Sequence, residues 1–128
     1  MKESWISSTL KSNPKINGLL FSKIKQEVLG KDYDLSLVFV GKKRIRTLNR
    51  AWRKKDYATD ILSFEVSAET GEIFICPEIA SKKAKGWDKN LEEYLPFVFV
   101  HGLFHLKGME HGSKMDSEEK KIRDKFKI

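Results

Sequence analysis

The chain has 128 residues, 40% of them hydrophobic, and a chain of this length can bury enough surface to fold as one domain. Its single cysteine excludes an internal disulfide framework, and its apolar stretches are too short to span a membrane. We therefore predict one cytoplasmic domain over residues 1–128, with no membrane partner. Twenty-five lysines and arginines against eighteen acidic residues leave a net charge of +7.

The first forty residues predict a helix and two strands. Residues 17–29 place apolar side chains four residues apart, between a possible N-cap at Asn17 and a terminating glycine at Gly30, as an amphipathic helix requires. Residues 35–40 are mostly apolar and either β-branched or aromatic, which predicts a largely buried strand. The first fifteen residues are expected to contain a further strand.

The next segment, residues 42–55, carries eight basic side chains and no acidic one. The basic residues are Lys42, Lys43, Arg44, Arg46, Arg50, Arg53, Lys54 and Lys55. Ile45, Leu48 and Trp52 recur three and four residues apart, which predicts a helix with this stripe against the core and the cations outward. Two interpretations remain open: a surface for phosphates and stacked bases, or a solvated helix face.

The middle of the chain predicts a β-hairpin followed by a helix. Residues 60–66 alternate as a half-buried strand does, and the short loop 68–71 returns the chain into residues 73–76. These two strands are close enough in sequence to pair in antiparallel fashion. Pro77 suits the first turn of a helix that ends near Gly86.

Two helices are predicted in the last third. Asn90 and Glu93 form a capping pair for a helix that is apolar nearly all round, which Pro96 is expected to kink or begin afresh. A last, highly charged helix follows from residue 113 and is expected to be a solvated face. The predicted class is α+β: a small mixed sheet with an antiparallel hairpin, helices packed on it, and a metal site on a central buried helix.

All three histidines fall within eleven residues, HGLFHLKGMEH, residues 101–111. On a helix, His101 and His105 project from one face, and Gly108 can end the helix so that His111 returns toward the same point. One such histidine would more often be a core residue, but three unmatched imidazoles are costly to desolvate without a metal. We predict one zinc ion per chain, with a fourth position left for water, whose pKa falls to about 7 on zinc.

The spacing H-x3-H-x2-G-x2-H also matches the long metalloprotease signature, except at the general base. The protease pattern places a glutamate directly after the first histidine, where this chain has Gly102. A glycine cannot accept a proton, so peptide hydrolysis is less favoured than another hydrolysis by metal-bound water.

Three blocks of the sequence are similar to motifs of a known family. The block at 101–111 is similar to HGxLHLxGYDH, residues 48–66 (LNRAWRKKDYATDILSFEV) to LNxxYRxxDxPTDVLSF, and GEIFI at 71–75 to a strand that begins GDI. On these blocks the chain resembles the YbeY family of bacterial endoribonucleases. The resemblance implies a single-strand-specific, metal-dependent hydrolase acting in late small-subunit quality control and in maturation of the 3′ end of 16S rRNA. Its expected partners are precursor ribosomal RNA and the small ribosomal subunit with its proteins.

The resemblance also assigns roles to residues. The three histidines match the family's zinc ligands, and Arg53 matches an arginine implicated in activity, which makes it the candidate catalytic residue. A guanidinium stays charged and can hold two phosphate oxygens at once. Thr59, Asp60 and Ser63 match a strand near the metal, where they either support the fold or orient a ligand histidine.

The chain departs from the family motifs at a few positions, and none of the changes removes a ligand. Ala58 replaces a proline, Glu72 an aspartate, and Glu110 the aspartate before the last histidine. Two other functions stay open. A metallopeptidase-like hydrolase is favoured if a carboxylate such as Asp60, Glu72 or Glu110 lies beside the metal-bound water. A non-catalytic RNA-binding ribosome biogenesis factor with structural zinc is the other.

Overall fold

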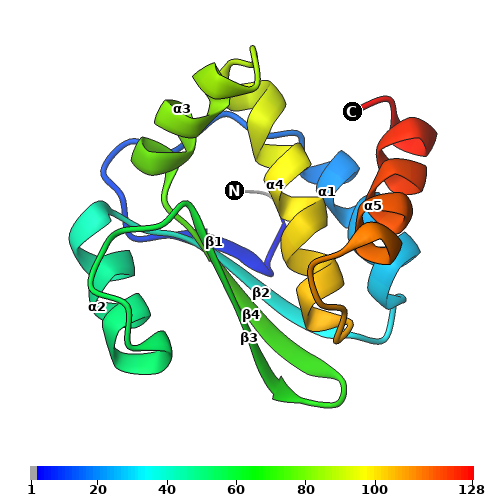
Figure 1. The fold of residues 1–128 in the computed structure, drawn as a ribbon, viewed down its shortest axis with the longest axis horizontal. Coiled ribbons are helices and arrows are strands. Elements are labelled where there is room, and N and C mark those ends of the chain that lie inside the picture. Colours follow the sequence, from blue (N-terminus) through cyan, green and yellow to red (C-terminus); the bar gives the residue numbers. More distant parts are fainter. Residues whose placement is uncertain (1–2) are drawn as a thin grey trace.

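The computed structural model describes residues 3–128 and arranges them as a mixed sheet between helices (Figure 1). In chain order the elements are β1 (Ile6–Ser8), α1 (Gly18–Leu29), β2 (Asp34–Phe39), α2 (Lys42–Arg53), β3 (Ile61–Ser67), β4 (Thr70–Ile75), α3 (Pro77–Gly86), α4 (Leu91–Leu106) and α5 (Ser113–Phe126).

Within residues 3–128 the four strands form one sheet in the order β1-β2-β4-β3. β2 pairs in parallel with both β1 and β4, and its central Leu37 lies opposite Ile6 on one side and Ile73 on the other. β3 and β4 form the predicted hairpin and pair in antiparallel fashion. The predicted α+β class with a mixed sheet is confirmed.

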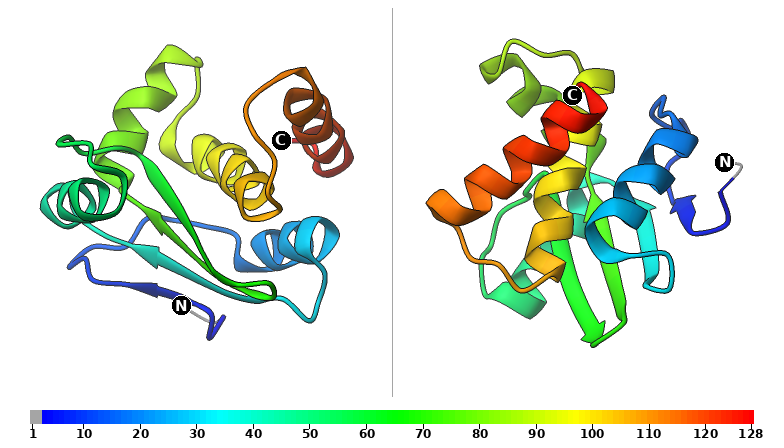
Figure 2. Two further views of the ribbon diagram at one scale, coloured as in Figure 1. Left: turned by 60° about the horizontal axis from the view of Figure 1, so that its bottom comes forward. Right: turned by 90° about the vertical axis from the view of Figure 1, so that its right-hand side faces the viewer.

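Helices cover both faces of the sheet because successive strand residues point to opposite sides. Leu37 and Ile73 pack in the main core with α1 and α4, whereas Leu62 of β3 packs in a smaller cluster with Ile45 of α2. In Figure 1, α2 accordingly lies to the left of the sheet and α1, α4 and α5 lie to its right. Figure 2 shows α5 lying outside α4, farther from the sheet.

The central helix α4 carries most of the main core. Its N-terminus has the predicted capping box: Asn90 accepts from the Glu93 N–H at 2.8 Å, and the Glu93 carboxylate accepts from the Asn90 N–H at 3.0 Å. The prediction that Pro96 begins a new helix is wrong, because Leu91–Leu106 is one helix. The carbonyl that loses its bond to Pro96 is that of Glu92, an exposed residue near the helix start that water can satisfy.

Two further expectations are corrected. The last helix, α5, is not simply a solvated face, because Met115 and Glu119 are buried and Ile122 packs against the core. In α2, Ile45 and Asn49 occupy the buried positions, so Trp52, one turn farther along, is left 72% exposed rather than packed in the core. No helix in the described part of the chain is long and apolar enough to cross a membrane.

Candidate metal centre

The end of α4 brings the three histidines together. Gly108 adopts a positive φ of 86°, its N–H donates to the His105 carbonyl at 3.0 Å, and the Met109 N–H donates to the Phe104 carbonyl at 3.1 Å. These two bonds form a Schellman motif, which satisfies the last helical carbonyls and reverses the chain. The turn therefore carries His111 back toward the face of α4 that presents His101 and His105.

The resulting geometry suits a divalent metal. His101, His105 and His111, here called the histidine group, each offer one nitrogen, and these nitrogens lie within 4.8 Å of one another. The Nε2 atoms of His101 and His105 are 3.1 Å apart. Two ligands of one tetrahedral zinc ion, each about 2.0–2.1 Å from it, lie about 3.3 Å apart, which is close to the separation of the His101 and His105 nitrogens.

The electrostatics at His105 favour its neutral imidazole, which is the metal-binding form. Burial lowers the pKa of His105, and the neighbouring rings of His101 and His111 lower it further. The positive charge of Arg53 acts in the same direction, while Glu119 opposes it.

Glu119 of α5 supports the histidine group from behind. Its buried carboxylate lies 3.1 and 3.2 Å from Nδ1 of His101, so Nδ1 holds the ring proton and Nε2 stays free to face His105. Glu119 is not among the site residues predicted from the sequence. A clue was present, because Met115, Glu119 and Ile122 recur at helical spacing and so place the carboxylate in the apolar stripe of α5.

Asp60 and Ser63 also lie in this region, but within residues 3–128 their side-chain hydrogen bonds go to groups other than the imidazoles. Asp60 is buried, accepts from the Tyr94 hydroxyl at 2.8 Å and pairs with Lys83 at 3.1 Å, which fastens the start of β3 to α4 and α3. Ser63 donates to the Gly102 carbonyl at 3.1 Å. Both residues hold α4 against the sheet.

Gly102 explains why the protease glutamate has no place here. A Cβ at this position would lie 2.7 Å from Cδ1 of Ile61 and 3.0 Å from the Ser63 hydroxyl. A glutamate side chain would therefore clash with β3 and could not reach toward the histidine group. Among the described residues, the acidic side chains that line the cavity beside the group are Asp60, Asp116 and Glu119. Of the three carboxylates proposed from the sequence, only Asp60 lines the cavity, where it accepts from Tyr94, Lys83 and the Thr59 hydroxyl.

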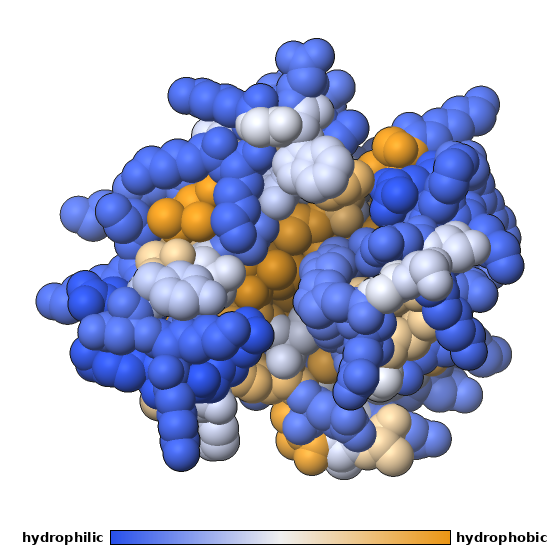
Figure 3. Space-filling view, in the orientation of Figure 1, coloured by the Kyte–Doolittle hydropathy of each residue, from blue (hydrophilic) through white to orange (hydrophobic). Residues whose placement is uncertain are grey.

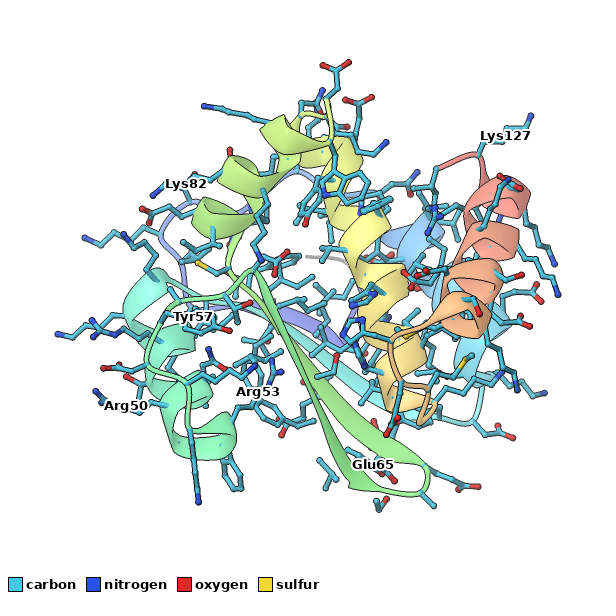
Figure 4. The ribbon with its side chains drawn as sticks, in the orientation of Figure 1. Arg50, Arg53, Tyr57, Glu65, Lys82 and Lys127 are labelled. Carbon is cyan, nitrogen blue, oxygen red and sulfur yellow. The ribbon has the colours of Figure 1, made fainter. Side chains whose placement is uncertain are left out.

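A cavity of about 850 Å³ opens in front of the histidine group, and Arg53 lines it too. Figure 3 shows this face as a hollow with a hydrophobic floor between hydrophilic flanks. Arg53 points from the end of α2 toward β3 and α4, whereas Arg50 points to the outer side (Figure 4). Arg46 and Arg50 pair with Asp56, while Arg53 forms no salt bridge within residues 3–128. The structure thus leaves its guanidinium available to a ligand.

Comparison with known proteins decides the family. The model of the family described as Endoribonuclease YbeY matches residues 4–127 of this chain. The chain belongs to the YbeY family. The resemblance seen in three sequence blocks is therefore confirmed over nearly the whole chain, and with it the prediction of an enzyme, a metal-dependent nuclease by family and by its histidine group.

Individual YbeY relatives agree with the family match. The endoribonuclease YbeY of Alkaliphilus metalliredigens is 38% identical over 106 residues, which is 74% of this chain and 68% of that protein. The YbeY of Staphylococcus carnosus is 34% identical over 122 residues, 86% of this chain and 79% of that protein. The solution structure of TM1509 from Thermotoga maritima superposes with a TM-score of 0.64 at 27% identity, covering 94% of this chain and 87% of that one.

Proposed function

We propose that residues 1–128 act as one hydrolase domain, a cytoplasmic endoribonuclease specific for single-stranded RNA. His101, His105 and His111 would hold one zinc ion, and Arg53 would be the catalytic residue that receives the phosphate. The observation that carries this proposal is the convergence of three imidazole nitrogens in a cavity that Arg53 also lines. When bound, zinc supplies Lewis acidity and lowers the pKa of a coordinated water to about 7.

Residues around the histidine group position the ligand histidines. Glu119 fixes the His101 ring with its proton on Nδ1, so Nε2 is presented without a competing proton. Ser63 and Gly102 set the distance of α4 from the sheet and therefore the position of His101 and His105. These contacts would keep the ligands in place before the substrate arrives, which reduces the reorganisation needed for the reaction.

Arg53 would hold the phosphodiester in front of the histidine group. Its guanidinium can donate two parallel hydrogen bonds to phosphate oxygens and offset the charge that develops there. The other cations of α2 would attract neighbouring phosphates. Binding should then weaken with salt, with a log-log slope of about −0.7 for each phosphate neutralised in single-stranded RNA. An affinity that is insensitive to salt would remove α2 from the RNA surface.

Family membership supports a finer assignment. We propose that the substrate is precursor ribosomal RNA, that the enzyme acts in maturation of the 3′ end of 16S rRNA and in late small-subunit quality control, and that small-subunit proteins are its partners. Cleavage of precursor rRNA within immature small subunits, compared with the same RNA alone, tests this assignment.

The proposed activity itself is tested with His105→Ala. This variant should lose bound zinc and cleavage of single-stranded RNA while its circular dichroism spectrum stays that of wild type, because His105 is only partly buried. The Lys82→Ala variant is a suitable control, since Lys82 is exposed on α3 and does not line the cavity. Retained zinc and full activity in His105→Ala would reject the site.

A further inference from the structure

A tryptophan that lines the cavity, Trp87, is not used by the proposed chemistry. Trp87 follows α3 directly, where its N–H donates to the Ala84 carbonyl at 3.0 Å, and it is 60% exposed. A single exposed aromatic side chain carries no meaning alone. Trp87, however, lines the same cavity as the histidine group, so this ring faces the space in which the substrate would lie.

Phe97 of α4 extends the aromatic surface toward the histidines. Its ring centroid is 5.3 Å from that of Trp87, with an angle of 49° between the planes, and it also lines the cavity. Phe97 precedes His101 by four residues, so both lie on one face of α4, about 6 Å apart along the helix axis. The aromatic pair, Trp87 and Phe97, therefore begins about one helical turn from the first metal-ligand candidate.

Cations surround the aromatic pair. The Arg123 guanidinium lies 5.2 Å and the Lys89 ammonium 5.4 Å from the centroid of the Phe97 ring. Lys83 lines the cavity nearby with half of its side chain exposed. Aromatic rings with cations beside them suit single-stranded nucleic acid, whose bases stack while its phosphates pair with the charges.

The acidic residues of the cavity do not cancel this arrangement. Asp60 pairs with Lys83 at 3.1 Å, and Glu119 lies 3.8 Å from Arg123 as well as against the histidine group. Asp116 lies in the first turn of α5, where the positive end of the helix dipole offsets part of its charge. The pairing offsets the charge of Lys83 and Arg123 as well, so Lys89 is the cation beside Phe97 that has no carboxylate partner within residues 3–128 and can meet a phosphate.

We propose that Trp87 and Phe97 form a stacking site for a base of single-stranded RNA, on a nucleotide flanking the phosphate that Arg53 receives. The inference rests on the proposed endoribonuclease function and adds to it a site for a base rather than for a phosphate. Because every base has a π-face, such a site contributes affinity and fixes the position of the strand without selecting a sequence. Such a site would also favour single strands, whose bases are free to leave the stack.

Binding of cleavage-resistant RNA to the zinc-loaded protein tests the inference without relying on activity. The probes are fluorescent 2′-O-methyl phosphorothioate oligomers, one complete and one in which every position is abasic. Trp87→Ala should bind the complete oligomer about 5- to 150-fold more weakly than wild type, the range that loss of one stacked base gives. Its affinity for the abasic oligomer should equal that of wild type, and Trp87→Phe should recover most of the loss.

Controls separate this inference from the proposed function. Leu19→Ala removes another exposed apolar side chain, 62% exposed on α1 and outside the cavity lining, and should change neither affinity. If wild type binds and cleaves RNA while Trp87→Ala binds both oligomers normally, or loses affinity equally for both, the stacking site is rejected and the endoribonuclease stands. If wild type neither binds nor cleaves single-stranded RNA, the proposed function fails, and the stacking site fails with it.

Discussion

The two flanks of the cavity are built on different principles. On the metal side, the histidine group is held by partly buried hydrogen bonds, from His101 to Glu119 and from Ser63 to the backbone of α4, and by a buried core of large apolar side chains. On the basic side, α2 displays its cations on an exposed surface, and its salt bridges, such as that of Arg46 with Asp56, are solvent-exposed.

This difference separates two requirements of one reaction. Metal ligands must be placed to within fractions of an ångström, and buried hydrogen bonds can supply that precision. Attraction of a polyanion depends on the number of exposed charges and tolerates mobile side chains. We therefore expect substitutions on the metal side to change zinc affinity but hardly RNA affinity. Substitutions on the basic side should change RNA affinity but hardly zinc affinity.

Zinc removal should produce the largest effect, and it should separate RNA cleavage most clearly from RNA binding. Chelation should abolish RNA cleavage, whereas binding of a cleavage-resistant oligomer should fall only modestly, since α2 keeps its charges. Cleavage assays and fluorescence anisotropy on the same chelated sample measure both, and added zinc should restore activity. Loss of RNA binding in parallel with activity would show that the two flanks do not act separately.

Arg53→Gln should lower the rate of cleavage by about 10- to 150-fold, because a hydrogen bond to a charged group contributes about 1.5–3 kcal/mol. Zinc content should not change. Arg50→Gln on the same helix is the matched control: Arg50 points outward and should lose only a little RNA affinity. Equal losses of cleavage rate in the two variants would show that Arg53 acts only as one of several cations on α2.

Glu119→Gln should weaken zinc binding by about 10- to 100-fold, the usual effect of losing the partner that orients a ligand histidine. RNA affinity measured at saturating zinc should stay unchanged. Glu118→Gln alters the neighbouring carboxylate, which is far more exposed and pairs with Lys121, and should leave zinc affinity at the wild-type value. Competition with a chromophoric chelator measures the zinc dissociation constants of both variants. Equal constants would show that Glu119 does not orient His101 for zinc binding.

The smallest effects concern stability. In Gly102→Ala the new Cβ meets Ile61 and Ser63, and overpacking of about 1–3 kcal/mol outweighs the gain of about 1 kcal/mol in helix propensity, so the variant should be destabilised by about 1 kcal/mol. Gly86→Ala, where a Cβ meets nothing within 4 Å, should be neutral or stabilised. Urea unfolding measures both, and a stabilised Gly102→Ala would show that α4 has room to move.

The sequence predicted what depends on local spacing. The histidine group, the capping box at Asn90 and the β-hairpin all follow from residues close together in the chain. Glu119 was missed because its partner His101 lies 18 residues away across a turn, and a charged helix reveals its buried face only once its packing is known. Trp52 was placed in the core because the periodicity of α2 does not show that the buried position is taken by Asn49.

The position of Glu119 has a consequence for the order in which the enzyme is completed. During translation this carboxylate leaves the ribosome after all three histidines, and it reaches His101 only when α5 docks on α4. A nascent chain would thus expose its imidazoles before they are oriented, and full metal affinity would arrive late in synthesis. A nuclease completed in this order stays weak until its last helix is in place.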